Sequence, residues 1–379
     1  MKSFYEVVIV GGGLAGTATA LALVQAGLKN VLIVEAGCYQ SDKPGETLAP
    51  EAGSLLNRLG LSDDLLNQRY LRSPGHYSEW GSQTAGATDF IAHPFGEGWH
   101  IDRRDFEQHL AYQAGLAGVE ILTGTRFIKR LSCSSSPAHR LLLKNTSGKL
   151  LTISCRFAVD ATGLRGALAT SFGSRPHYHA KQLFLYGFFT LPTAMKPDPR
   201  TTIEAVENGW WYKARLPDNR MIISLATSPR YYKAQQLHDW SQWLNELAAT
   251  NLVSQSMDQV AFSPQSFSVA SGPTYLRSID DDNAIADSWT AVGDACMAVD
   301  PIFGRGMINA LTHGADAGEA IARCIDGDAT PLCNLHFNNE QQFATYQRHR
   351  SLCYQWEQRW PHSSFWTDRQ RPADNPIVG

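Results

Sequence analysis

The chain has 379 residues, of which 43% are hydrophobic and 18% charged. This length and composition indicate a folded protein with more than one small core and not a disordered chain. Its 33 basic and 36 acidic residues give a formal net charge of −3, which excludes the basic excess expected of a protein that binds nucleic acid or an anionic membrane. The 7 cysteines are scattered without a C-x-x-C pair, which favours reduced thiols in the cytoplasm over a zinc or redox site.

The N-terminal segment predicts a strand, a glycine-rich turn, a helix and a second strand. An apolar run over 6–10 precedes a helix of small residues over 14–25, and a second apolar run covers 31–35. A signal peptide or membrane span is the alternative for this uncharged stretch, but its central glycines and the charge of Glu6 oppose it. We therefore expect a βαβ unit.

The glycines of this turn follow the pattern G-x-G-x-x-G at Gly11, Gly13 and Gly16. In a dinucleotide-binding fold the first glycine permits a tight turn, the second admits a pyrophosphate and the third lets the helix approach the strand. The helix begins at Leu14 and Ala15, and its N-terminus would add partial positive charge for the phosphates. A glycine-rich turn without a ligand is the alternative.

A carboxylate ends the second strand of the unit. Glu35, followed by Ala36, is placed to accept hydrogen bonds from the ribose hydroxyls of an adenosine. The same charge would repel a 2′-phosphate, so the pattern disfavours NADP at this site.

The next hundred residues mix helices with short strands. A Pro/Gly loop leads to a predicted helix over 51–61, and residues 71–100 are irregular with short strands. A second helix is predicted over 102–115 from its apolar spacing, and short strands fill 119–159.

Alternating apolar and polar residues over 182–230 predict an antiparallel sheet with one covered face. A helix is predicted over 233–252, a strand over 290–297 and a long helix of small residues over 306–325. The last fifty residues predict a Trp- and Gln-rich helix and then a Pro-rich tail that frays.

A second motif lies near the other end of the chain. In the stretch AVGDACMAVDPIFGRGMINAL an apolar strand ends at Gly293 and Asp294, and a Pro-containing loop then leads to Gly304 and Gly306, which open a helix. This segment resembles the second flavin motif of the p-hydroxybenzoate-hydroxylase-like monooxygenases and the flavin-dependent halogenases.

The resemblance implies FAD as the cofactor. It places Asp294 at a ribityl hydroxyl and the stretch from Pro301 through Met307 beside the isoalloxazine. Backbone donors at the helix N-terminus would stabilise an anionic reduced flavin. An aspartate that only caps an ordinary helix is the alternative.

A third segment, FAVDATGLRG, is similar to the central Asp-x-x-Gly segment of the same family and puts Asp160 and Gly163 in those positions. Its short form resembles the halogenase side, which implies an external flavin reductant in place of internal NAD(P)H binding. Arg103 stands where the family places an arginine that contacts the flavin, and a surface salt bridge is the alternative for it.

Two segments, GETLAP and NGWWYKARLPDNRMIISLAT, resemble tryptophan halogenases, with departures. The W-x-W-x-I-P motif is incomplete, because Trp210 is followed by Tyr212 and no Ile-Pro comes next. Halogenases also need a lysine after the first loop, and none occurs between Lys43 and Lys129. Halogenation is therefore disfavoured.

The segments GETLAPEAGSLLNRLGL, GWHIDRRDFEQHL and DPIFGRGM are similar to the LodB/GoxB-like flavoproteins, which build tryptophylquinone cofactors inside amino-acid oxidases. This resemblance implies a monooxygenase that uses O₂ to hydroxylate a tryptophan side chain in a partner protein, the precursor of a quinone-dependent amino-acid oxidase. A small-molecule aromatic or indole hydroxylase or halogenase is one alternative. A non-catalytic flavin-dependent maturation chaperone is another.

No side chain is singled out as the catalytic acid or base, and no metal site is predicted. Aromatic residues on the predicted sheet either line the substrate pocket or form ordinary core. Because successive side chains of a strand point to opposite faces, every second one should face the flavin. These aromatic residues are Phe184, Tyr186, Phe188, Trp210, Trp211 and Tyr212. The candidates for catalysis are Glu46, His76, His93, His100, Trp210 and Tyr212.

The expected fold class is α/β, or α+β overall: a Rossmann-type FAD-binding domain with an inserted antiparallel-sheet substrate domain and C-terminal helices. The FAD-binding domain is expected to be discontinuous, because its two motifs flank the antiparallel segment. The expected ranges are 1–75, 96–175 and 270–330 for the FAD-binding domain, 76–95 and 176–269 for the substrate domain, and 331–379 for the C-terminal helical segment and tail.

Overall fold

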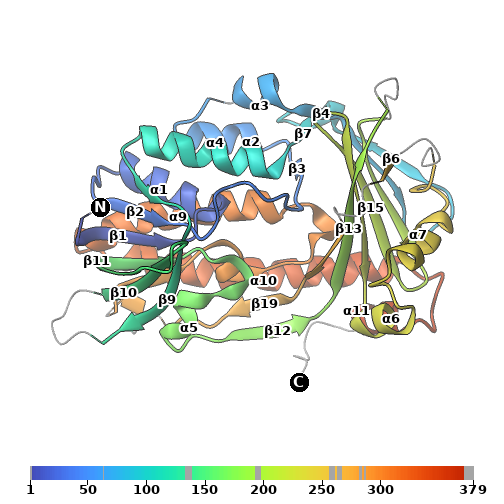
Figure 1. Cartoon of the computed structure of the whole chain (residues 1–379). Helices are drawn as coiled ribbons and strands as arrows, with labels where there is room; N and C mark the ends of the chain where they lie inside the picture. Colours follow the sequence, from blue (N-terminus) through green and yellow to red (C-terminus); the bar gives the residue numbers. More distant parts are fainter. Residues whose placement is uncertain are drawn as a thin grey trace.

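A computed structural model gives the architecture, with a mainly parallel sheet and its helices at one end and a large antiparallel sheet at the other (Figure 1). The expected fraying tail beyond Gln370 lies outside the described residues. The structure describes residues 2–62, 64–132, 139–192, 198–255, 261–262, 267–280, 284–285 and 287–370.

The mainly parallel sheet has the order β8-β2-β1-β11-β20, and the hairpin β9–β10 pairs antiparallel with the first half of β11. Residues of β1 alternate between two cores, with Val7 and Ile9 on one face and Val8 and Val10 on the other. These strands are buried on both faces, as parallel strands between helices are. Their bounds are β1 Phe4–Val10, β2 Val31–Val34, β8 Glu120–Leu122, β9 Thr125–Leu131, β10 His139–Asn145, β11 Leu150–Asp160 and β20 Trp289–Ala291.

Helices cover this sheet and extend towards the other one. Helix α10 spans 27 residues, about 40 Å, and contributes Phe343 to the core under the parallel sheet and Tyr354 to a core against the antiparallel sheet. It therefore ties the two ends of the molecule together (Figure 1). The main helices are α1 Leu14–Gln25, α2 Ala52–Arg58, α3 Asp64–Arg69, α4 Arg103–Leu116, α5 Ala167–Ser171, α6 Pro229–Ala234, α7 Trp240–Ala248, α9 Gly306–Ile325, α10 Thr330–Trp356 and α11 Ser364–Gln370.

Helices α1 and α9 pack backbone to backbone. A Cβ atom on Gly314 would lie 2.4 Å from the carbonyl oxygen of Ala15, and one on Gly318 would lie 2.5 Å from Cβ of Ala22. Contacts advance along both helices in the same direction, so α1 and α9 run parallel. Their N-termini therefore open towards the same end of the sheet.

The antiparallel sheet has the order β17-β13-β16-β15-β14-β5-β6, with β18 also paired to β13. Strand β5 pairs parallel with β14, so residues from the irregular stretch 71–100 join this sheet. The domain boundaries given above stay a prediction. The strand bounds are β5 Gly75–Glu79, β6 Gly86–Asp89, β13 Leu183–Thr190, β14 Thr201–Val206, β15 Gly209–Leu216, β16 Arg220–Thr227, β17 Ala261–Phe262 and β18 Ser268–Ser271.

Two small sheets lie between the large ones: β3-β7-β4 and β12-β19-β21. Within the described residues, no helix is both long and apolar enough to cross a bilayer. The bounds are β3 Thr47–Leu48, β4 Leu71–Ser73, β7 Gly98–His100, β12 Pro176–Ala180, β19 Thr274–Arg277 and β21 Met297–Ala298.

The expected fold class is confirmed, and the predicted helices over 14–25 and 306–325 end where α1 and α9 end. Two elements were predicted wrongly. The single helix over 233–252 is two helices, because Gln236 takes a positive φ of 51° and Asp239 caps α7 through a hydrogen bond from Ser241 N. The strand over 290–297 is interrupted, because Gly293 takes a φ of 57° and opens a 3-10 turn.

The α1–α9 contact gives a stability test. We expect Gly314→Ala to lower the free energy of unfolding by about 2 kcal/mol, because the added methyl meets backbone atoms of α1. The matched control is Gly115→Ala near the end of α4, where a Cβ would meet nothing within 4 Å. Alanine loses less backbone entropy than glycine when the helix forms, so this variant should be at least as stable as the wild type. Urea unfolding of both variants measures this, and an equal stability of the two would contradict the close packing.

Candidate functional site

The glycine-rich loop forms a tight turn between β1 and α1. Gly11 has a φ of 113°, and a Cβ there would lie 2.1 Å from the carbonyl oxygen of Ala161, so only glycine fits. A Cβ on Gly16 would lie 2.0 Å from the carbonyl oxygen of Gly11. Gly13 is the N-cap of α1 and has no side chain to cap the first-turn N–H groups, which leaves them for an anion.

Glu35 supports this loop from the end of β2. Its two carboxylate oxygens accept the N–H groups of Gly12, at 2.7 Å, and Gly37, at 2.6 Å. The Tyr39 hydroxyl donates to the Gly12 carbonyl at 2.9 Å. An apolar pocket of about 480 Å³, lined in part by Tyr39 and Ile121, adjoins the loop, and its chemistry suits an adenine ring.

The start of α9 forms a second open cradle. A 3-10 turn over Pro301–Phe303 precedes Gly304, which has a φ of 63°, and a Cβ on Gly304 or Gly306 would meet nothing within 4 Å. Gly314 of α9 lies level with the start of α1, so α9 begins about 12 Å further out along the common direction. The two partially positive helix ends thus face the same side and lie close in space, although Leu14 and Gly306 are far apart in the chain.

Asp294 lies on the strand side of this cradle. Protein atoms enclose Asp294 on most sides, but its side chain still reaches solvent, so the residue lies in a deep cleft. Burial raises the pKa of the Asp294 carboxyl, and the charge of Arg103 opposes the rise. A carboxylate here would gain from hydroxyl donors of a ligand, because hydroxyls can satisfy it without neutralising it.

Arg103 is held beside the cleft by an ion-pair network. Its Nε lies 2.8 Å from Oε1 of Glu107, and Lys43 Nζ lies 2.6 Å from Oε2. Burial opposes the charge of Glu107, but Arg103 and Lys43 outweigh it and lower the pKa of the carboxyl. A Cβ on Gly45 would lie 2.5 Å from Nη1 of Arg103 and 3.8 Å from Sδ of Met307, so these three residues are neighbours. Arg103 therefore lies in the cleft and not on the open surface.

These features fit FAD. The α1 end and loop would hold the pyrophosphate, Glu35 the ribose, Asp294 the ribityl chain, and the stretch from Pro301 through Met307 the flavin ring. FAD, when bound, would supply the reaction of O₂ with a reduced flavin. Asp160 is fully buried, and its oxygens accept from Thr162 and from Ala169 N at 2.7 Å, so any role in FAD binding would be indirect. Gly163 takes a φ of 63° in the turn that follows it.

Four polar side chains meet where β3 and β7 approach β15. Thr47 Oγ1 lies 2.8 Å from Oη of Tyr212 and 3.0 Å from Nδ1 of His100. His100 Nε2 lies 2.6 Å from the carbonyl oxygen of Pro199. The Tyr212 hydroxyl is also a hydrogen-bonding neighbour of the Glu46 carboxyl. The candidates Glu46, Tyr212 and His100 are therefore brought together.

The other candidates make different contacts. His76, on β5, contacts the ring of Phe90 at 6.0 Å, and His93 packs against Phe90 and Phe95. Trp210 is buried and donates its indole N–H to Oη of Tyr354 at 3.1 Å, so it packs in the core between the sheet and α10.

The aromatic residues of the antiparallel sheet divide between its two faces. Tyr186, Phe188 and Tyr212 share the inner face with Ala214, and each residue is partly accessible. Trp211 points to the outer face, where it packs against Trp243 of α7. The expected alternation is therefore present in the structure.

Sequence reasoning missed three residues of the site. Thr47 directly follows the candidate Glu46, but its contact with Tyr212 joins positions 165 apart, which no local pattern reveals. Glu107 lies four residues after Arg103 on a helix, a spacing that could have predicted the ion pair. Lys43 completes that network from the preceding loop.

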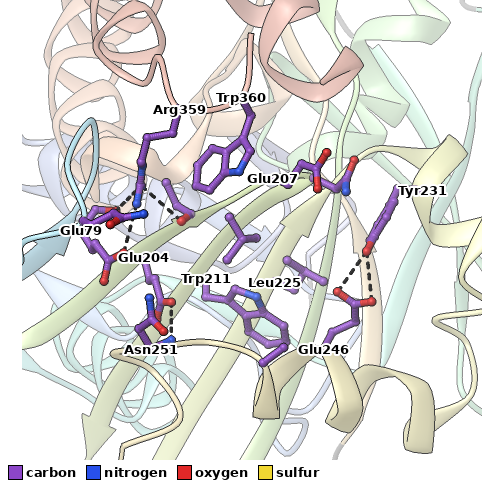
Figure 2. Close-up of a pocket in the computed structure, with 15 residues that line it drawn as sticks. Glu79, Glu204, Glu207, Trp211, Leu225, Tyr231, Glu246, Asn251, Arg359 and Trp360 are labelled. Atoms are coloured by element: carbon purple, nitrogen blue, oxygen red, sulfur yellow. Dashed lines mark hydrogen bonds and ion pairs between the residues drawn. The ribbon is translucent and has the colours of Figure 1, made fainter. Parts of the chain in front are cut away.

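A separate pocket of about 370 Å³ lies on the outer face of the antiparallel sheet (Figure 2). Trp211 and Leu225 form its floor, Tyr231 and Glu246 face each other from α6 and α7, and Trp360 lies over it. None of the catalytic candidates is among the described residues that line it. The pocket lies across the sheet from the flavin cradle.

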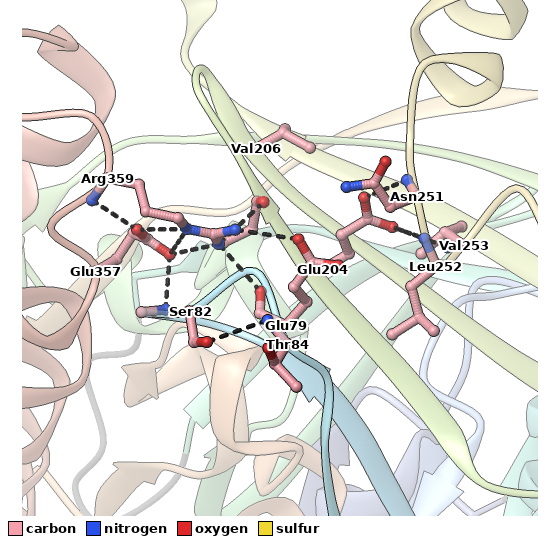
Figure 3. Close-up of polar contacts among 12 residues, drawn as sticks. Glu79, Ser82, Thr84, Glu204, Val206, Asn251, Leu252, Val253, Glu357 and Arg359 are labelled. Carbon is pink, nitrogen blue, oxygen red and sulfur yellow. Dashed lines mark hydrogen bonds and ion pairs between the residues drawn. The ribbon is translucent and has the colours of Figure 1, made fainter.

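Buried ion pairs close this pocket at one side (Figure 3). Arg359 donates to Oε1 of Glu79 at 3.0 Å and to both oxygens of Glu357, at 2.9 Å from Nε and 2.7 Å from Nη2. Glu204 accepts three backbone N–H groups, from Asn251 at 2.6 Å and from the next two residues at 2.8 Å. These carboxylates are satisfied by the fold itself, so they fasten the chain after α10 and the loop after α7 to the sheet.

The Arg359 network gives a second stability test. We expect Arg359→Ala to lower the free energy of unfolding by about 3 kcal/mol, because it leaves the buried carboxylates of Glu79 and Glu357 unpaired. Arg323→Ala, which breaks the exposed pair with Asp328, is the control and should cost less than about 1 kcal/mol. Denaturant unfolding compares the two, and similar losses would contradict a structural role for Arg359.

His100 gives a pH test. Burial lowers its pKa from 6.5 to about 4, so the unfolded chain binds a proton in that window and the folded chain does not. The resulting stability, about 3 kcal/mol, is present above pH 6.5 and is lost as the pH falls towards 4. Unfolding measured at several pH values should show this loss reduced in His100→Gln and unchanged in His349→Gln, a substitution of an exposed histidine. A His100→Gln profile that parallels the wild type would contradict it.

Comparison with known proteins agrees with this geometry. The family model described as FAD binding domain matches residues 4–347. The putative FAD-dependent oxidoreductase LodB of Marinomonas mediterranea is 24% identical over 96% of this chain and 96% of its own length. A tryptophan 2-halogenase of Chondromyces crocatus is 24% identical over 94% of this chain but 66% of its own length.

Solved structures show the same fold. The myxobacterial chondrochloren halogenase CndH superposes with a TM-score of 0.86 at 19% identity, over 98% of this chain and 86% of that one. The peptidyl tryptophan dihydroxylase QhpG superposes with a TM-score of 0.70 at 21% identity, over 97% of this chain and 78% of that one. The chain therefore belongs to the FAD binding domain family and is an FAD-dependent oxidoreductase of its monooxygenase and halogenase group.

Proposed function

We propose that this flavoprotein hydroxylates a tryptophan side chain in a partner protein, the precursor of a quinone-dependent amino-acid oxidase. The observation that carries the proposal is the partly accessible aromatic face of Tyr186, Phe188 and Tyr212, which adjoins the Arg103 side of the cradle through Glu46. A flat, electron-rich indole suits such a face.

The relatives support a protein substrate. LodB matches this chain over nearly the full length of both, whereas the tryptophan 2-halogenase extends well beyond it. QhpG, which shares the fold, is described as a peptidyl tryptophan dihydroxylase essential for tryptophylquinone cofactor biogenesis. O₂ and an external flavin reductant would be the co-substrates.

The lysines argue against halogenation. Lys43 Nζ is engaged by Glu107 at 2.6 Å, and no lysine follows until Lys129. Lys213, on β15, points to the outer face and donates to the carbonyls of Leu252 and Val253. Neither amine lies free at the inner face.

A small-molecule aromatic hydroxylase or halogenase is the second candidate, since CndH shares the fold over 98% of this chain. Turnover of free indole, tryptophan or a phenol with reduced flavin would favour it. A non-catalytic maturation chaperone would instead retain its effect when FAD binding is abolished.

Co-expression with an oxidase precursor tests the proposal. We expect the precursor tryptophan to gain the mass of one or two oxygen atoms with the wild-type protein, and to gain none with Gly13→Glu, whose carboxylate would enter the phosphate cradle. Arg323→Ala, at the opposite end of α9 from the cradle, is the control and should give the wild-type mass. Peptide mass spectrometry measures this. An unmodified tryptophan beside FAD-loaded wild-type protein would refute the proposal.

A further inference from the structure

The pocket on the outer face of the antiparallel sheet has a volume of about 370 Å³, within the range of about 300–1,000 Å³ that ligand sites have. Strands β14, β15 and β16 form its floor, helices α6 and α7 form one wall, and the chain after α10 forms the other (Figure 2). The sheet lies between this pocket and the flavin cradle. A small molecule bound here could not reach the flavin, so the pocket is not the place of the oxidation.

One end of the pocket already holds a cation of the protein. The guanidinium of Arg359 lies 4.3 Å from the centre of the Trp360 ring. It also pairs with Glu79 at 3.0 Å and with Glu357 at 2.7 Å (Figure 3). An aromatic ring flanked by two carboxylates attracts a cation through the ring quadrupole and both negative charges. The fold therefore satisfies this end of the pocket by itself.

The opposite end has the same kinds of group without a cation. Tyr231 donates its hydroxyl hydrogen to Glu246, whose two carboxylate oxygens both lie 3.0 Å from Oη. Burial raises the pKa of the Tyr231 hydroxyl, and the charges of Glu246 and Glu207 raise it further, so Glu207 lies near the same hydroxyl. Neither glutamate forms an ion pair with any described residue. Glu207 is exposed and Glu246 is half-buried, so a ligand can reach both.

The floor of the pocket supplies a buried donor. Trp211 is 1% exposed, and Figure 2 shows its indole nitrogen turned toward the cavity. Among the residues that the structure describes, none accepts this N–H. A buried donor without an acceptor lowers stability, so an occupant that accepts from it is favoured. The occupant should therefore present a hydrogen-bond acceptor as well as a positive charge.

We propose that this pocket takes a lysine or arginine side chain of the partner protein, and is thus a second contact for the protein substrate, remote from the flavin. The positive charge lies against Glu246 and Glu207, and a main-chain carbonyl of the same segment accepts from Trp211. A basic residue carries both groups, because its side chain bears the charge and its peptide group the acceptor. The identity of the partner rests on the proposed function, whereas the affinity for a basic residue does not.

Fluorine NMR of the FAD-loaded protein labelled with 5-fluorotryptophan tests the pocket without a partner. The probes are the N-methylamides of Nα-acetyl-L-lysine and Nα-acetyl-L-arginine, and the N-methylamide of Nα-acetyl-L-norleucine is the uncharged control. We expect at least one basic probe to shift the Trp211 and Trp360 signals in a saturable way, and the norleucine probe to leave them unchanged. Trp211→Phe and Trp360→Phe assign the two signals.

A matched pair of variants shows where the charge binds. We expect Glu246→Gln to weaken binding of the basic probe about tenfold, because it removes one carboxylate charge and keeps the shape of the side chain. Glu340→Gln removes an exposed carboxylate of α10 that is not among the described residues lining the pocket, and should leave the affinity unchanged. Bound FAD and the thermal unfolding midpoint show that each variant is folded. No saturable shift, an equal response to the norleucine probe, or an affinity that Glu246→Gln leaves unchanged would overturn the assignment of the pocket.

The partner is tested by binding and not by oxygenation. In calorimetric titrations the oxidase precursor should bind the wild type and Glu340→Gln equally, and Glu246→Gln about tenfold more weakly. Equal binding to all three proteins, or binding to none, would overturn the assignment to the partner. A precursor that binds in the expected pattern but gains no oxygen would count against the proposed function alone, so the two failures are distinguishable.

Discussion

The parallel packing of α1 on α9 is the contact on which the rest of the structure depends. Glycine and alanine at the interface let the two backbones approach, because any larger side chain at Gly314 or Gly318 would meet backbone or Cβ atoms of α1. Since the helices run in the same direction, their two partially positive ends open on one side of the sheet. Segments almost three hundred residues apart in the chain thereby form one elongated anion- and flavin-binding cradle.

The two faces of the antiparallel sheet have different roles. Its inner face presents Tyr186 and Phe188, and Tyr212 contacts Thr47 with Glu46 beside it. The outer face buries Trp211 under α7 and is secured by carboxylates that the fold satisfies. Helix α10 sets the distance between sheet and cradle, because Tyr354 accepts from Trp210 and donates to Asp300, at the start of the loop before α9, at 2.7 Å. A hydrogen-bonded path thus connects the antiparallel sheet to the flavin loop.

The sequence predicted the features that local patterns encode. The glycine spacing, the small-residue helices and the alternation over 182–230 each reflect one element and its burial, so the fold class followed from them. The break inside 233–252 depends on a positive φ at Gln236, a residue without a turn signature. Trp210 was a catalytic candidate by residue type, but its burial against α10 is a tertiary contact. Thr47 was missed because its partners come from two other strands.

The central claim is that one cleft, formed where α1 and α9 begin, holds one FAD through both motifs. Calorimetric titration of FAD into the cofactor-stripped protein measures this most directly, alongside the same titration with Asp294→Ala. The account predicts one FAD per chain for the wild type and weakened binding for the variant, although the substitution lies far from the glycine loop along the chain. A protein that stays colourless and takes up no FAD, or one whose affinity is indifferent to Asp294, would contradict it.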